Sequence, residues 1–171
     1  HDEAAHRGDG LPNSLEQLAR ILKDLARYPE AETLCREALV ARRATVGGNN
    51  AGVLSSLLAL AEVQAARGDD AAAVATHREG LAITREHLGP KHPALTRNLV
   101  ALAENLIKQG SFPEAETTLA EAGRIEEGLG YVRIEPQRDW HRAQLKLHTA
   151  WAASDAAAAH TAASRQRLSS Q

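Results

Sequence analysis

Two short segments of this sequence are nearly the same. Residues 28–32 read YPEAE, and residues 112–116, which lie 84 positions further along the chain, read FPEAE. The match extends on both sides of this pair at the same separation. The first copy contains Leu15, Leu18, Ala19, Leu22, Cys35 and Ala38, and the second contains Leu99, Leu102, Ala103, Leu106, Leu119 and Ala122 at the corresponding positions. The chain therefore contains an internal repeat.

A third, more degenerate copy lies halfway between these two. At a separation of 42 residues, the same positions are filled by Leu57, Leu60, Ala61, Gln64, His77 and Gly80. A period of 20 to 50 residues is typical of solenoids, in which one structural unit stacks on the next. In the first and last copies the leading apolar residues are spaced i, i+3, i+4 and i+7, which predicts an amphipathic helix.

Each copy is predicted to form two helices joined by a tight turn near residues 26–27, 68–69 and 110–111. Pro29 and Pro113 fall in the first turn of the second helix, where proline is tolerated. Asp69 and Ser111 are predicted N-caps. Glycines near residues 47–48, 89–90 and 128–130 predict where the second helices end. Small residues such as Ala31 are predicted to lie where two helices approach closely, because a larger side chain would overpack there.

The pattern resembles the tetratricopeptide repeat, in the 42-residue form found in kinesin light chains and in many bacterial multidomain proteins. That form carries a link similar to LGxxHP, which is nearly intact at residues 88–93 (LGPKHP) and worn at residues 46–51 (VGGNNA). The resemblance covers about residues 11–130. It implies a scaffold for protein or peptide partners, and we expect the chain to be a fragment of a larger bacterial protein.

The expected fold class is all-α, a right-handed superhelical solenoid of antiparallel helix pairs. Residues 1–10 are expected to be a frayed N-terminal remnant. Residues 11–130 hold three tetratricopeptide-like repeats, at about 11–52, 53–94 and 95–130. Residues 131–171 form a divergent fourth repeat or cap, with a helix pair at about Glu135–Ala152 and Asp155–Arg167. Trp140 and Trp151 are expected to cover the last interface of the stack.

Composition and charge exclude few functions but favour a water-exposed domain. The chain is 43% hydrophobic and 25% charged with a net charge of -2, so nothing draws it to nucleic acid or to an anionic membrane. No apolar run approaches the ~20 residues of a membrane span. The single cysteine, Cys35, favours a reducing compartment, and we expect a cytoplasmic location.

The first helix of each pair is expected to line the concave face of the stack, where partners would bind. Helix geometry assigns to this face the residues that avoid the packing leucines: Asn13, Glu16, Arg20, Lys23, Asp24, Ser55, Leu58, Glu62, Ala65, Ala66, Arg97, Val100, Glu104, Ile107 and Lys108. The apolar members flanked by cations favour a groove for an amphipathic segment. Alternatively, they pack on the capping helix or on a neighbouring repeat.

Paired asparagines, which in kinesin light chain repeats precede the packing Leu-Ala, are missing here. Those positions read Glu16-Gln17, Leu58-Ala59 and Val100-Ala101, so kinesin-type cargo recognition is not implied.

No catalytic or metal-binding constellation is found. His141 and His148 are seven residues apart, which is not the i, i+4 spacing of a helical metal site. Cys35 replaces a packing residue and is expected to be a buried, inert thiol. The predicted function is a non-catalytic interaction scaffold without metal or cofactor, and the oligomeric state is left open. The alternative is a regulatory or sensory module of a larger bacterial signalling enzyme, such as a serine/threonine kinase.

Overall fold

The computed structural model describes residues 10–46, 51–129 and 134–169, and the regular structure within these ranges is entirely helical. The helices are α2 (Gly10–Asp24), α3 (Tyr28–Val46), α4 (Ala51–Arg67), α5 (Asp70–Leu88), α6 (Ala94–Lys108), α7 (Phe112–Glu127) and α8 (Ile134–Ser169). The predicted all-α class is confirmed.

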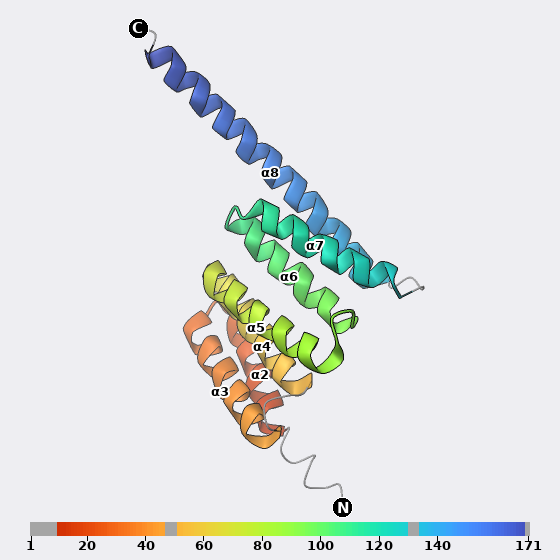
Figure 1. Cartoon of the computed structure of the whole chain (residues 1–171). Helices are drawn as coiled ribbons and strands as arrows, with labels where there is room; N and C mark the ends of the chain where they lie inside the picture. The colour runs from red at the N-terminus through yellow and green to blue at the C-terminus, as the bar shows by residue number, and fades with distance from the viewer. Residues whose placement is uncertain (1–9, 47–50, 130–133, 170–171) are drawn as a thin grey trace, which may run out of the picture.

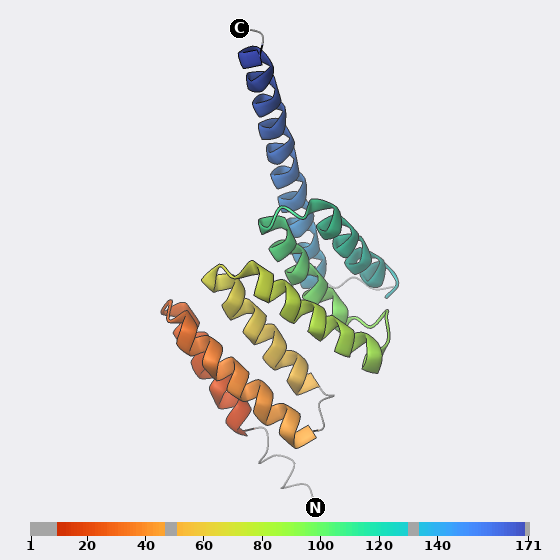
Figure 2. The same ribbon diagram turned by 60° about the vertical axis from the view of Figure 1, so that its left-hand side comes forward.

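The helices form consecutive antiparallel pairs that stack along one direction (Figure 1). Helix α2 packs on α3, α4 on α5 and α6 on α7. Each later first helix also packs on the preceding second helix, α4 on α3 and α6 on α5. Turning the molecule shows α2 and α3 at one end of the stack and α8 at the other (Figure 2). The predicted helical-repeat solenoid is confirmed, while its right-handed sense stays a prediction.

Surface ion pairs between neighbouring second helices follow the same period. Arg43 of α3 binds Glu79 of α5, and 42 residues later Arg85 of α5 binds Glu121 of α7 at 2.8 Å. Because each pair joins equivalent positions of adjacent units, the stack repeats its surface contacts as well as its core.

The turn inside each helix pair uses a left-handed residue. Ala26, Gly68 and Gly110 have φ of 57°, 88° and 74°. The next residue then donates its amide hydrogen to a carbonyl of the first helix, as in the 2.9 Å bond from Ser111 N to Leu106 O. Asp69 caps α5, since its Oδ1 accepts from Ala72 N at 3.1 Å. Ser111 occupies the N-cap position of α7, but its side chain makes no capping hydrogen bond.

The predicted close approaches at alanine are confirmed. The equivalent residues of all three units are buried among the helices: Ala19, Ala61 and Ala103 on the first helices, and Ala31, Ala73 and Ala115 on the second. Short side chains at these positions let the two helices of a unit dock.

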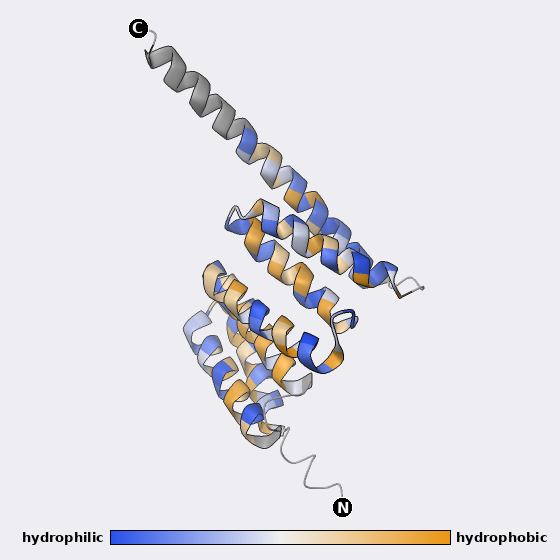
Figure 3. Ribbon diagram, in the orientation of Figure 1, coloured by the Kyte–Doolittle hydropathy of each residue, from blue (hydrophilic) through white to orange (hydrophobic). Residues whose placement is uncertain are grey.

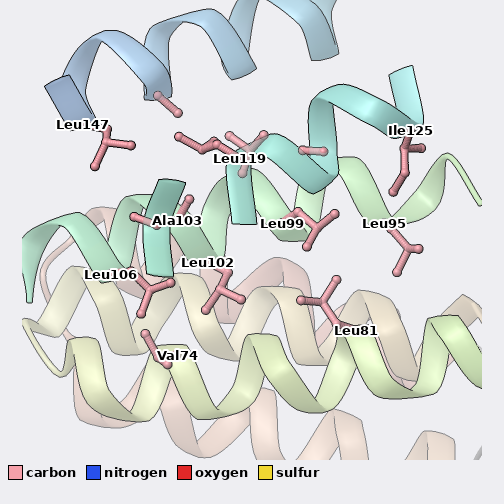
Figure 4. Packing of buried hydrophobic residues seen from close by; sticks show 14 residues of the cluster. Val74, Leu81, Leu95, Leu99, Leu102, Ala103, Leu106, Leu119, Ile125 and Leu147 are labelled. Carbon is pink, nitrogen blue, oxygen red and sulfur yellow. The ribbon is translucent and has the colours of Figure 1, made fainter. Parts of the chain in front are cut away.

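Two apolar clusters are separated by a buried polar layer. The larger cluster joins α5, α6, α7 and α8 around Leu99 and Leu119 (Figure 4). The smaller joins α2, α3 and α4 around Cys35 and Leu57. Buried polar contacts lie in the middle unit, including Thr76 Oγ1 to Gln64 Oε1 at 2.8 Å. The degenerate middle copy therefore folds like its neighbours but replaces apolar contacts with hydrogen bonds.

The predicted C-terminal helix pair is wrong, because α8 is one continuous helix of 36 residues. The position equivalent to Gly68 and Gly110 is Ala152, and no glycine or proline stands near it. Alanine is the strongest helix former, so the helix continues where the other units turn. Its second half extends beyond the stack (Figures 1 and 2). The coloured first half of α8 is also more hydrophilic than α6 (Figure 3).

The first half of α8 docks as a fourth first helix would. Trp140 lies 42 residues after Asn98, and both side chains lie over a glycine of the preceding second helix, Gly123 and Gly80 respectively. Trp140 Nε1 also donates to Leu119 O at 2.7 Å. Trp151 stacks on Phe112 with ring centroids 5.8 Å apart. Both tryptophans cover the last interface, as predicted.

Candidate partner-binding groove

The first helices α2, α4, α6 and α8 share one face of the stack, and a series of adjoining hollows runs along it. One hollow of about 470 Å³ lies between α2, α4 and α6, and one of about 660 Å³ lies between α4, α6 and α8. Glu62 lines two of the hollows, and Glu104 of α6 lines three, so they form one continuous surface. We call this surface the groove.

The structure brings the predicted lining residues together on this face, with one exception. All of them line the hollows except Asn13. Asn13 instead accepts a hydrogen bond from Arg42 Nη2 at 2.6 Å, between α2 and α3. The helical spacing therefore predicted which residues share a face, although not which of them are free to bind a partner.

Much of the charge in the groove is paired within the groove itself. Glu62 of α4 lies 3.5 Å from Lys23 of α2 and 3.0 Å from Arg97 of α6, so one carboxylate joins three first helices. Lys146 of α8 binds Glu104 of α6 in the same way. Pairs as exposed as these contribute only about 0.2–1 kcal/mol each, so a partner can exchange them at small cost.

Glu16 differs from the other groove charges, because buried side chains outside the groove bind its carboxylate. The nearly buried Arg42 of α3 binds it at 3.1 Å, and Ser56 donates a hydrogen bond to it. This carboxylate therefore fixes α2 to α3 and α4. Sequence reasoning missed Arg42, because nothing in the repeat pattern marks a cation that turns inward.

The predicted apolar strip divides into two parts. Leu58 and Ala65 are partly exposed in the groove. Val100 is buried in the C-terminal cluster and Ile107 packs against it, so the alternative of packing toward the capping helix holds for these two. The cap adds a residue that the sequence did not predict, Leu145, whose side chain is largely exposed.

An apolar hollow of about 620 Å³ marks the α8 end of the groove. Ile107 and Leu145 line it together with the small residues Ala150 and Ala153, and the charged residues Glu104, Lys108 and Lys146 also line it. Sequence reasoning missed this hollow because it assigned the lining to the first helices of three repeats and treated residues 131–171 as a cap.

At the opposite end, the hollow between α2 and α4 is polar. Arg20 is exposed there and donates to the neutral side chain of Gln17 at 2.6 Å. Cys35 lies beneath the hollow and is fully buried, and this burial raises the pKa of its thiol to about 11. The thiol is therefore neutral at physiological pH, as expected for an inert packing residue.

Neither a metal centre nor a membrane span is found in the part of the chain that the structure describes. Over the described ranges, no group of three histidine, cysteine, aspartate or glutamate residues could hold a metal ion. None of the helices in those ranges is long and apolar enough to cross a bilayer.

Comparison with known proteins also finds a helical repeat in this chain. Residues 11–86 match the family model of the tetratricopeptide repeat. The match covers the first two helix pairs, which are therefore similar to tetratricopeptide repeats. No curated protein matches the chain.

Two solved structures have the same fold. Both are of Podosopora anserina repeats described as kinesin light chain nearly identical TPR-like repeats, one of them a Q17M variant. Each is 24% identical, with TM-scores of 0.66 for the variant and 0.65 for the other, and covers 78% of this chain. The chain spans 65% of the length of those solved chains.

The groove is lined by the first helix of three helix pairs and by the docked half of α8. Lys146 stands 42 residues after Glu104 and 84 after Glu62, so α8 continues the register of the lining. The cap therefore extends the groove by one helix.

Proposed function

We propose that this chain is a non-catalytic scaffold that binds a peptide or a partner helix in the groove. Tetratricopeptide repeats generally mediate protein–protein interaction. The observation that carries the proposal is the continuous lining of α2, α4, α6 and α8, in which adjacent hollows share residues. An extended segment needs such a surface, because it contacts several repeats at once.

The two ends of the groove favour a partner with two kinds of side chain. The α8 end offers an apolar hollow with Leu145 exposed in it, which suits an aliphatic or aromatic anchor. The α2 and α4 end offers Arg20, Lys23 and Arg97 around Glu62, which suits polar or acidic side chains. We propose that such a partner places its apolar anchor at the α8 end of the groove.

The proposal includes a reducing cytoplasm, which is consistent with the buried Cys35 thiol. It also fits a chain that acts as the regulatory module of a larger bacterial signalling enzyme, since such a module would use the same groove.

Selection of linear peptides on the immobilised chain tests the proposal. Selected peptides should bind Leu145→Asp at least about tenfold more weakly, which corresponds to about 1.4 kcal/mol. Arg20→Gln/Arg97→Gln should weaken the same peptides by a smaller factor, because exposed charges contribute less.

Matched controls lie on the second helices. Val40 of α3 is as exposed as Leu145, and Arg78 and Arg85 of α5 are exposed and ion-paired on that outer surface. Val40→Asp and Arg78→Gln/Arg85→Gln should bind as the unaltered chain does. If the selected peptides bound the control variants more weakly and the groove variants normally, the binding surface would lie outside the groove.

A further inference from the structure

The carboxylate of Glu62 lies in the groove between cations of the two neighbouring first helices. Lys23 of α2 lies 3.5 Å from its Oε2, and Arg97 of α6 lies 3.0 Å from its Oε1. The Glu62 side chain is 44% exposed, so it meets these cations at the surface of the groove rather than beneath it. The chain itself therefore places a carboxylate where a bound segment would cross from α2 to α6.

Cations outnumber carboxylates around Glu62. The hollow beside it, with a volume of about 200 Å³, is lined by three cations: Arg20, Lys23 and Arg97. The other carboxylate of this hollow, Glu16, is bound by Arg42, which lies outside the hollow. Among the described residues that line the hollow, Glu62 is therefore the carboxylate that remains for three cations. The hollow has an excess of positive charge.

Two of these cations are able to bind a further carboxylate. Arg20 donates to the neutral side chain of Gln17 at 2.6 Å, and no carboxylate of the described part of the chain forms an ion pair with it. Arg97 is 75% exposed, and an ion pair at such a surface is weak enough to exchange. A guanidinium binds a carboxylate through parallel hydrogen bonds. The hollow is smaller than a typical small-molecule pocket, so it suits a single side chain.

We propose that this hollow takes the side-chain carboxylate of an aspartate or glutamate in the bound segment, and that Glu62 competes with it for Arg97. The inference rests on the proposed function, because it concerns the same groove. Glu62 then determines selectivity at this end of the groove. A neutral side chain does not replace the Glu62 carboxylate beside Arg97, whereas an acidic side chain does so and also pairs with Arg20.

Groove peptides test the inference, and we define them as peptides selected on the immobilised chain that Leu145→Asp weakens. Each should contain an acidic residue, and its replacement by the matching amide should weaken binding about two- to fivefold, as for an exposed ion pair. Glu62→Gln should strengthen binding of the acidic peptide about two- to fivefold and leave its amide version unchanged. Fluorescence anisotropy at low ionic strength measures these affinities, because salt screens exposed charges.

The matched control is Glu121→Gln on the second helices. It changes the net charge by the same amount and also removes a carboxylate from an arginine, Arg85, on the outer surface. The acidic peptide should bind this variant as it binds the unaltered chain. Because Glu62→Gln is expected to raise the affinity, a misfolded variant would not imitate the result.

Failure of the inference and failure of the proposed function give different results. If groove peptides bound Glu62→Gln no more tightly than the unaltered chain, or kept their affinity without acidic residues, the competition would be overturned and the groove would remain the binding surface. If only amidation of the peptide C-terminus weakened binding, the hollow would take a terminal carboxylate, and the side-chain assignment would be overturned. If Leu145→Asp weakened no selected peptide, the proposed function would fail, and this inference with it.

Discussion

The first and third units begin their second helices with almost the same five residues, yet they meet the next unit through different chemistry. In the first unit, Glu32 is buried and binds Arg67 of α4 at 2.6 Å, with Arg36 and Gln64 beside it. In the third unit, the equivalent Glu116 is exposed. There the residue equivalent to Arg67 is Trp151, which stacks on Phe112.

This contrast separates the geometry of the repeat from its chemistry. Alanines at the helix approaches and left-handed residues in the turns are common to both units and set how the helices pack. The inter-unit contacts are then filled by ions at the α3–α4 interface and by aromatic rings at the α7–α8 interface. The first should be sensitive to the loss of charge, and the second to the loss of volume.

Loss of the Trp140 ring should have the largest effect, at the aromatic interface. Trp140→Ala removes the ring that lies over Gly123 and the hydrogen bond to Leu119 O. Because the ring is only partly buried, the free energy of unfolding should fall by about 3 kcal/mol, at the low end for tryptophan truncation. Urea unfolding measures it, and His148→Ala, on the exposed side of α8, is the control. A change below about 1 kcal/mol would mean that α8 does not dock on α7 through this ring.

Loss of the Glu32 carboxylate should come next, at the ionic interface. Glu32→Ala removes the acceptor shared by Arg67 and Arg36, and both cations are partly exposed, so water can solvate them. The expected loss is therefore about 2 kcal/mol, below that of a fully buried pair. The equivalent change Glu116→Ala should cost less than about 0.5 kcal/mol. Equal effects at the two positions would remove the distinction between the interfaces.

The sequence could predict what is repeated, because repetition and helical spacing are local. The 42-residue period, the turn positions and the buried alanines such as Ala31 all follow from side-chain size and from the 3.6-residue turn. The shared face of the groove residues follows in the same way, since residues three and four apart lie on one side of a helix.

Features that depend on a distant partner could not be predicted. Glu32 and Arg42 turn inward because charges from other helices receive them, and their own sequence neighbours do not show this. The burial of Val100 depends on how the cap docks, so helical spacing alone places it in the groove. Ser154 and Asp155 resemble the start of a helix. No glycine precedes them to adopt a left-handed turn, so α8 continues through these residues.

The polar layer of the middle unit should make stability depend on pH. His77 Nδ1 lies 2.6 Å from Asn98 Oδ1, and burial lowers the pKa of this histidine, although Asn98 and Glu62 partly oppose the shift. The unfolded chain, with an ordinary pKa near 6.5, then binds more protons at lower pH. Stability should be full above about pH 6.5 and fall below it, by at most about 1.4 kcal/mol per pH unit. Urea midpoints measured over this pH range for the unaltered chain and for His77→Gln test the prediction. The midpoint of the variant should depend less on pH.

The turns give the smallest effect and return to the first and third units. Ala26 and Gly110 occupy equivalent left-handed positions, with φ of 57° and 74°. Alanine is strained there by about 1–2 kcal/mol, while glycine costs more backbone entropy on folding. Ala26→Gly should therefore raise the free energy of unfolding by about 0.5 kcal/mol, and Gly110→Ala should lower it by about 1 kcal/mol. Thermal unfolding of both variants measures the two signs. If Ala26→Gly instead lowered the free energy of unfolding, contacts of the alanine methyl group would stabilise this turn by more than the left-handed conformation costs.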